Sequence, residues 1–242
     1  MRAAGTTYWV QVHGQSREIE MNDDHASIPV DQLVQISVSD GNIEGDLTIP
    51  DGAQGMVLFA HGAGSSRHSS RNNFVAEALN KGGLATLLIN LLTAEEKKVD
   101  RQTREVRFDI DRLSRRVVTT VDWLGDQPET ADLALGVFGS STGAAGALIA
   151  ASRRPERVDA VVSRGGRVDL AEPILGEVQA PSLFIVGEKD TRVLQWNREA
   201  LAQLEVVKEL QVVTAAGHLF EEPGALEKVA QLSRAWFQQH LG

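Results

Sequence analysis

Short apolar runs alternate with longer segments of helical periodicity along most of this chain, and this alternation restricts the fold more than any other feature. The runs are rich in Val, Ile and Leu and occupy residues 34–38, 45–49, 56–60, 85–91, 133–138, 158–163, 182–186 and 210–214. The later runs are nearly continuous in hydrophobicity, as expected of strands that helices cover on both faces. Strands alternating with helices predict a mostly parallel sheet with right-handed crossovers.

Two further segments carry apolar residues at intervals of three and four, which is the pattern of one helix face. They span residues 106–124 and 224–240. The runs 34–38 and 45–49 lie close in sequence and predict an antiparallel hairpin at the sheet edge. We therefore predict one α/β domain over residues 32–242, preceded by an N-terminal appendage, residues 1–31, whose structure and role the sequence leaves open.

Composition excludes several classes of function. The chain has 33 acidic and 24 basic residues, a formal net charge of -9, which disfavours binding to nucleic acid. It has 0 cysteines, which excludes disulfides, thiolate metal sites and a cysteine nucleophile. No run approaches the roughly 18 apolar residues of a membrane span, and the N-terminus lacks the order of a secretory signal. We expect a cytoplasmic protein with no membrane partner, and the oligomeric state stays open.

The stretch LALGVFGSSTG, residues 133–143, carries the strongest chemical signal. Its last five residues fit G-x-S-x-G, between a strand and the small-residue helix AAGALIAAS. This is the context of a nucleophile elbow, in which flanking glycines permit a sharp turn that exposes the serine hydroxyl. The register selects Ser141, because Ser140 occupies the variable position. The alternative is a turn in which the serine only caps the helix.

A serine hydroxyl needs a base to accept its proton, so the motif predicts a histidine further along the chain. His218 follows the last apolar run through small residues, which places it at the same sheet edge. In elbow hydrolases the acid lies between serine and histidine in the sequence. Asp190, after the run 182–186, is our choice; Glu188 is an alternative acid, and Asp190 as a simple helix cap is another reading.

The oxyanion of the tetrahedral intermediate needs backbone N–H donors. The turn HGAG, residues 61–64, follows the run 56–60, where elbow hydrolases place the first donor, here Ala63. The residue after the nucleophile, Thr142, supplies the second. We expect His61 to hold this turn by hydrogen bonds. Metal ligation is disfavoured because no second ligand is spaced near His61, and the chemistry requires neither a metal nor a cofactor.

The motifs HGAG, GSSTG, GEKD and GH at successive strand ends are similar to those of the α/β-hydrolase superfamily. The segment SSRHSSRNNFVAEALNKGGLATLLINLLT resembles its dienelactone-hydrolase-like branch, and the resemblance covers about residues 33–241. It implies an α/β-hydrolase fold with a mostly parallel eight-stranded sheet, helices on both faces, and ester or lactone hydrolysis through an acyl-enzyme. Dienelactone hydrolases carry a cysteine nucleophile, whereas Ser141 stands here, which favours carboxylesterase-like activity over hydrolysis of dienelactone itself.

Several arginines fall in loops expected at the active edge of the sheet. Arg67 and Arg164 are candidates for binding a substrate carboxylate or phosphate by paired hydrogen bonds. The alternative is structural pairing with nearby acids. Residues 164–181 are too few for a large helical lid, so we expect an open site with little or no lid.

The sequence thus predicts a serine hydrolase that cleaves a small or polar carboxylic ester or lactone, with a small-molecule substrate and Ser141 as nucleophile. Two alternatives remain open. The same triad hydrolyses other bonds in other proteins, such as carbon–carbon bonds, because the fold does not fix the reaction. A non-catalytic binding protein on the same scaffold is the other reading.

Overall fold

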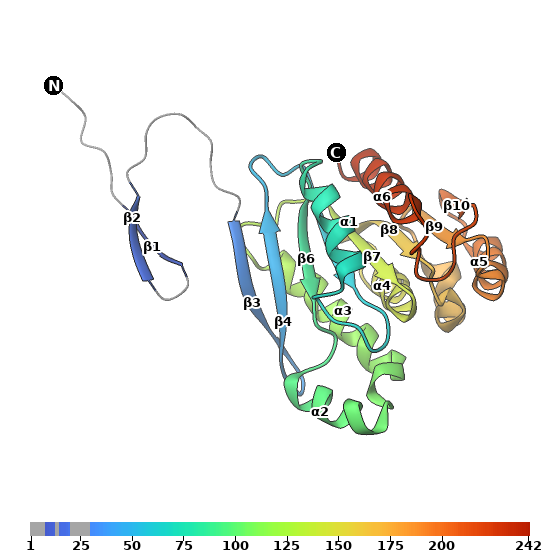
Figure 1. The fold of residues 1–242 in the computed structure, drawn as a ribbon, viewed down its shortest axis with the longest axis horizontal. Helices are drawn as coiled ribbons and strands as arrows, with labels where there is room; N and C mark the ends of the chain where they lie inside the picture. Colours follow the sequence, from blue (N-terminus) through green and yellow to red (C-terminus); the bar gives the residue numbers. More distant parts are fainter. Residues whose placement is uncertain (1–7, 13–14, 20–29) are drawn as a thin grey trace.

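The computed structural model describes residues 8–12, 15–19 and 30–242, and its central feature is an eight-stranded sheet (Figure 1). The strand order is β10-β9-β8-β7-β5-β6-β4-β3. The strands are β3 (Val30–Val38), β4 (Gly41–Ile49), β5 (Met56–Ala60), β6 (Ala85–Ile89), β7 (Leu135–Ser140), β8 (Val158–Arg164), β9 (Ser182–Gly187) and β10 (Lys208–Val213). β3 pairs antiparallel with β4, as does β4 with β6, and the other neighbours pair parallel. The predicted sheet and its edge hairpin are confirmed.

The N-terminal appendage contributes a separate two-stranded sheet. β1 (Tyr8–Val12) pairs antiparallel with β2 (Gln15–Ile19). The predicted boundary before residue 32 falls inside β3, which begins at Val30. Residues 1–7, 13–14 and 20–29 of the appendage lie outside the described residues.

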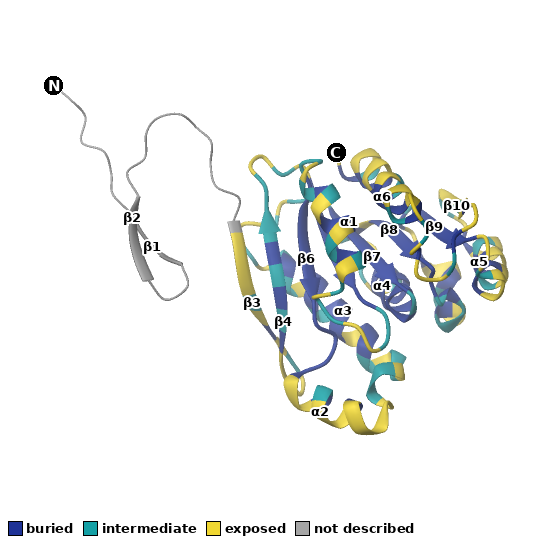
Figure 2. Ribbon diagram, viewed as in Figure 1, coloured by how far each residue is buried: buried dark blue, intermediate teal, exposed yellow. Residues whose placement is uncertain are grey.

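Helices cover both faces of the large sheet (Figure 1). On one face lie α1 (Ser70–Asn80) and α6 (Ala225–Leu241). On the other lie α3 (Ile110–Gly125) and α4 (Thr142–Arg153). Successive side chains of β5 alternate between the two layers: Val57 and Phe59 join the core under α1 and α6, whereas Leu58 joins the other core. This explains the continuous hydrophobic runs, since each inner strand is buried on both faces (Figure 2).

Two helices begin where polar side chains cap them. The helical periodicity predicted a start at residue 106, but Val106–Phe108 form a short 3-10 turn and α3 begins at Ile110. The reason is Asp109, whose carboxylate accepts the backbone N–H of Arg112 at 3.0 Å and so caps α3. α2 (Ala94–Thr103), an exposed helix in Figure 2, starts with a capping box formed by Thr93 and Glu96.

The segment between β8 and β9 packs into the core instead of covering the site. It contains a 3-10 segment, η2 (Val168–Glu177), of which Val168, Ala171 and Leu175 are buried. This agrees with the predicted absence of a large lid at this position. α5 (Thr191–Gln203) follows β9 and completes the layer beside α4. Among the helices described, none combines the length and hydrophobicity needed to cross a membrane.

Candidate active site

Ser141 lies at the sharp turn between β7 and α4. Its backbone is in the left-handed region, with φ of 51° and ψ of -121°, which is a strained conformation for a residue with a side chain. The flanking glycines are required: a Cβ on Gly139 would lie 2.4 Å from the Cα of Ala144, and one on Gly143 would lie 2.2 Å from the carbonyl oxygen of Ala60. The side chain of Ser141 makes no capping hydrogen bond to α4, so the reading of this serine as a helix cap lacks its defining contact.

The turn that follows β8 holds the backbone of Ser141 from both sides. The N–H of Ser141 donates to the carbonyl oxygen of Arg164 at 3.1 Å, and the N–H of Arg167 donates to the carbonyl oxygen of Ser141 at 2.9 Å. Ser140, in contrast, is buried, with its hydroxyl 3.5 Å from the carbonyl oxygen of Ala60. The turn therefore places Ser141 at the cavity and leaves the hydroxyl of Ser140 buried.

His218 lies in the loop after β10 and contacts the predicted acid. Its Nδ1 is 2.5 Å from Oδ2 of Asp190, which directly precedes α5 and has a mostly buried side chain. Asp190 makes no side-chain capping bond to α5. The alternative acid, Glu188, is used elsewhere: its Oε2 accepts the backbone N–H of Ala215 at 2.8 Å. Asp190 thus has the position that orients the imidazole, and Glu188 supports the histidine loop.

The side chains of Ser141 and His218 line the same cavity, of about 230 Å³, with Arg71 and Arg164 on its wall. No hydrogen bond joins the side chains of Ser141 and His218, both of which the structure describes. Catalytic hydrogen bonds in hydrolases are often long before substrate binds and shorten in the complex. The cavity is therefore lined by Ser141 and His218, and Asp190 contacts His218 from outside the lining, so one contact of the predicted triad is formed and one is open.

The predicted oxyanion donors lie beside the nucleophile, but one of them is already engaged. The N–H of Ala63 donates to Oγ1 of Thr142 at 2.8 Å. The turn approaches the nucleophile so closely that a Cβ on Gly62 would lie 3.0 Å from Cβ of Ser141. For Ala63 to stabilise an oxyanion, the Thr142 hydroxyl must rotate away. The sequence predicted a role for the backbone N–H of Thr142 as an oxyanion donor, but it did not reveal this contact of the Thr142 hydroxyl.

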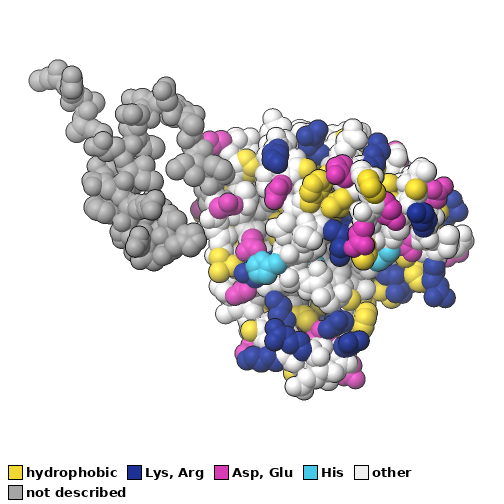
Figure 3. Space-filling view, viewed as in Figure 1, with side chains coloured by type: hydrophobic (Ala, Val, Ile, Leu, Met, Phe, Trp, Pro, Cys, Tyr) yellow, Lys and Arg dark blue, Asp and Glu magenta, His cyan; other side chains and the backbone are white. Residues whose placement is uncertain are grey.

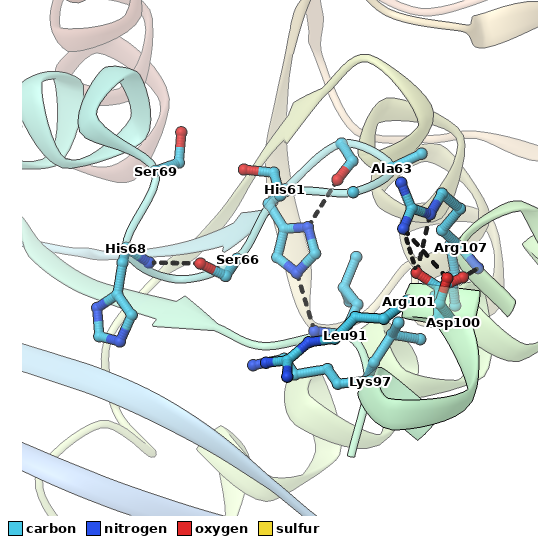
Figure 4. Close-up of a pocket in the computed structure, with 15 residues that line it drawn as sticks. His61, Ala63, Ser66, His68, Ser69, Leu91, Lys97, Asp100, Arg101 and Arg107 are labelled. Atoms are coloured by element: carbon cyan, nitrogen blue, oxygen red, sulfur yellow. Dashed lines mark hydrogen bonds and ion pairs between the residues drawn. The ribbon is translucent and has the colours of Figure 1, made fainter. Parts of the chain in front are cut away.

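His61 holds this turn against the end of β6, as expected (Figure 4). Its Nδ1 lies 2.8 Å from the carbonyl oxygen of Gly62, and its Nε2 accepts the backbone N–H of Leu91 at 3.1 Å. Burial lowers the pKa of His61 to about 4, so the ring is neutral near pH 7 and Nδ1–H is the donor to Gly62. Within the described residues, no group of three or more His, Asp or Glu side chains is arranged to hold a metal ion.

Arg67 lies apart from the nucleophile. Its guanidinium is paired with two carboxylates of β4, at 2.9 Å from Asp46 and 3.1 Å from Glu44. It does not line the cavity of Ser141. The structural pairing that was the alternative for these arginines is the arrangement found at Arg67.

Arg164 is different, because it lines the cavity and has no acid partner there. Its side chain is 7% exposed, and both Nε and Nη1 are buried without a hydrogen-bond acceptor. Burial and, to a smaller extent, the nearby charge of Arg71 lower the pKa of Arg164 to about 10. Arg71 itself has a buried Nε without an acceptor, although its Nη1 lies 3.4 Å from Glu221. Two cations with unused donors thus face the cavity of Ser141.

A larger cavity, of about 420 Å³, adjoins the HGAG turn (Figure 4). Gly62, Ala63, Ser65 and Ser69 line both cavities. The far wall of the larger one is formed by α2 and the following segment, with Lys97, Arg101 and the ion pair of Asp100 with Arg107.

Comparison with known proteins gives a consistent set of relatives. The model of a family described as the dienelactone hydrolase family matches residues 43–240. Two curated proteins from strains of Mycobacterium tuberculosis, whose names describe them provisionally as phosphoribosyl transferases, are 50% identical over 211 residues. The match covers 87% of this chain but 47% of each of those proteins, so the chain spans about half the length of these relatives.

Solved structures support the same fold. The crystal structure of a dienelactone hydrolase from Anabaena variabilis is 54% identical, with a TM-score of 0.87, over 88% of this chain and 99% of that one. Est1E from Butyrivibrio proteoclasticus is 14% identical, with a TM-score of 0.72, over 86% of this chain and 98% of that one. At this low identity, the likeness to Est1E concerns the fold alone.

Proposed function

Since the chain belongs to the dienelactone hydrolase family and is a hydrolase, we propose that it cleaves small or polar carboxylic esters or lactones through an acyl-enzyme on Ser141. The observation that carries the proposal is the contact of 2.5 Å between Asp190 and His218, which lines the cavity together with Ser141. The curated relatives are about twice as long as this chain, so their transferase name is not carried over to it.

In the proposed acylation, the Ser141 hydroxyl oxygen attacks the ester carbonyl carbon while Nε2 of His218 takes its proton. Asp190 accepts the Nδ1–H bond, holds the ring in that tautomer and stabilises the imidazolium. When the intermediate collapses, the bond to the alcohol oxygen breaks and His218 returns the proton to that oxygen. Water then attacks the acyl-enzyme by the same steps, which releases the acid and restores Ser141.

The negative charge on the carbonyl oxygen is stabilised, in this proposal, by the backbone N–H groups of Thr142 and Ala63. The Ala63 N–H donates to the Thr142 hydroxyl in the structure, so substrate binding includes a rotation of that side chain. The N–H of Ala63 then donates to the oxyanion in place of the Thr142 hydroxyl. The new hydrogen bond is stronger than the one it replaces, because the oxyanion carries a full negative charge.

The substrate that fits is small, and we propose that it carries an anionic group. The cavity of about 230 Å³ leaves no room for a long acyl chain. Arg164 keeps its charge in that cavity without an acid partner, which costs stability unless a ligand anion binds there. A carboxylate or phosphate of the substrate is the partner that a guanidinium recognises. Arg67, already paired, is left out of this part of the proposal.

Labelling of the intact protein with a fluorophosphonate tests the nucleophile and separates an enzyme from a binding protein on the same scaffold. We expect Ser141→Ala to abolish both labelling and hydrolysis of p-nitrophenyl acetate. Ser140→Ala is the matched control and should keep both, since the Ser140 hydroxyl is buried and lies against the carbonyl oxygen of Ala60. Loss of activity in Ser140→Ala, with Ser141→Ala active, would contradict the assignment.

A further inference from the structure

The larger cavity beside the HGAG turn has a positive wall that the proposed chemistry does not use. Lys97 and Arg101 lie one helical turn apart on α2 and both line this cavity. Figure 4 shows their side chains running alongside each other beneath Leu91. Figure 3 shows Lys and Arg side chains gathered over α2, although the chain as a whole has a net charge of -9.

Every acid of α2 already has a cationic partner. Glu96 is buried and lies 2.7 Å from Arg112 and 2.9 Å from Arg116. Asp100 is buried and lies 2.7 Å from Arg107. These acids therefore do not neutralise the cavity wall.

The remaining acid, Glu95, pairs with Lys98 at 3.4 Å on the exposed side of the helix. Lys97 and Arg101, by contrast, have no carboxylate within 4.0 Å in the part of the chain that the structure describes. Like charges at this helical spacing repel one another. The pKa of Lys97 is lowered, first by burial and then by the charge of Arg67; the charge of Glu44 opposes this shift and that of Arg101 adds to it. The helix thus holds two unneutralised cations toward a cavity.

The cavity also adjoins the cavity of Ser141. Gly62, Ala63, Ser65 and Ser69 form the wall between the two cavities, and the N–H of Ala63 is the proposed oxyanion donor. A substrate whose ester lies at Ser141 has only this turn to cross before it reaches Lys97 and Arg101. Serine hydroxyls on the near wall and cations on the far wall are the groups that bind phosphate.

We propose that the larger cavity binds a phosphate group of the substrate. This phosphate lies on the part of the substrate that extends from Ser141 past the turn at residues 62–65. This inference rests on the proposed esterase function and narrows the substrate class to phosphorylated esters. Lys97 and Arg101 are binding residues in this proposal and take no part in the chemistry at Ser141.

Calorimetric titration with inorganic phosphate tests the site directly. An Arg164→Gln background removes the buried guanidinium of the smaller cavity, which is itself proposed to bind an anion. In that background, Lys97→Gln and Arg101→Gln should each weaken phosphate binding by about tenfold or more. Lys98→Gln is the matched control, because it removes the same charge from the exposed side of α2. Equal phosphate affinity in all these variants, or no binding before they are introduced, overturns the proposal. Succinate that binds as tightly as phosphate overturns the assignment to phosphate.

Kinetics separate this inference from the proposed function. Acetylglycerol phosphate should have a higher kcat/KM than acetylglycerol, and the double change Lys97→Gln/Arg101→Gln should remove the difference. Hydrolysis of p-nitrophenyl acetate should be unaffected by that change. A chain that hydrolyses the neutral ester but shows no preference for the phosphorylated one refutes the subsite and leaves the esterase intact. A chain that hydrolyses none of these esters refutes the esterase itself.

Discussion

Replacing Arg164 by methionine distinguishes an arginine kept for binding from one kept for folding. The side chain is 7% exposed, and two of its nitrogens are buried without acceptors. Burial, with help from Arg71, lowers its pKa to about 10, which corresponds to about 3 kcal/mol of unfavourable free energy for the charged form in the fold. Its weak contact with Phe220, 5.9 Å from the ring centroid, returns about 1 kcal/mol.

Methionine keeps most of the apolar stem, so Arg164→Met should stabilise the protein by about 2 kcal/mol. For a chain of 242 residues this raises the Tm by about 4–8 °C, measurable by calorimetry. The same change should erase any preference for mono-p-nitrophenyl succinate over its neutral methyl ester, measured as a ratio of kcat/KM. A gain in stability with a loss of anion preference is the signature of a charge retained for a ligand.

Arg154→Met is the matched control for that experiment. Arg154 forms a two-point pair with Asp122, at 2.6 Å from Nε and 2.8 Å from Nη2, on the outside of the molecule. Its removal should cost at most about 1 kcal/mol and leave both esters unaffected. If Arg164→Met instead lowered the Tm more than Arg154→Met, and the ester ratio stayed unchanged, Arg164 would be structural and the anionic substrate would be refuted.

Three further outcomes are expected. Asp190→Asn should lower kcat strongly, and Glu188→Gln should leave more activity because that side chain bonds the backbone of Ala215; the reverse order in esterase assays would reassign the acid. Thr142→Ala should raise kcat/KM by up to about tenfold, with Thr142→Ser near wild type, because the N–H of Ala63 no longer has an internal acceptor; a fall in Thr142→Ala would show that the hydroxyl assists catalysis. Burial lowers the pKa of His61 from 6.5 to about 4. As the pH falls, the imidazole is therefore protonated in the unfolded chain before it is protonated in the folded protein. About 3 kcal/mol of folding stability should be lost as the pH falls from 6.5 to about 4. Urea unfolding of His61→Gln should lack that loss, and an unchanged pH profile would contradict the assignment.

The elbow and the triad order could be predicted from the sequence because their causes are local. Gly139 and Gly143 are needed by the tight turn at Ser141, whatever the rest of the chain does. The sequence favoured Asp190 but left Glu188 open as an alternative, since both follow β9 within a few residues. The contact that separates them, from Glu188 to the backbone of Ala215, crosses between two strands.

The roles of the charged residues depended on contacts that no local pattern reveals. Arg67 and Arg164 looked alike as loop arginines near the nucleophile. Glu44 and Asp46, which neutralise Arg67, come from β4 on the antiparallel side of the sheet, more than twenty residues earlier. Charges of both signs are interspersed along α2, so the sequence by itself shows no binding patch there. Only the pairing of its buried acids with arginines outside the helix leaves Lys97 without a partner.

The turn after β8 has a consequence for how this site can change over evolutionary time. Arg164 accepts the N–H of Ser141 through its own carbonyl, while Arg167 donates to the carbonyl of Ser141. The nucleophile and the neighbouring guanidinium therefore sit on one hydrogen-bonded backbone unit. Because these bonds use only main-chain atoms, exchange of the side chain at position 164 alters recognition and preserves the alignment of the reacting oxygen. An insertion in that turn would shift the nucleophile together with the guanidinium. We therefore expect a change of substrate preference at this site to arise from substitution at position 164 and not from a longer turn.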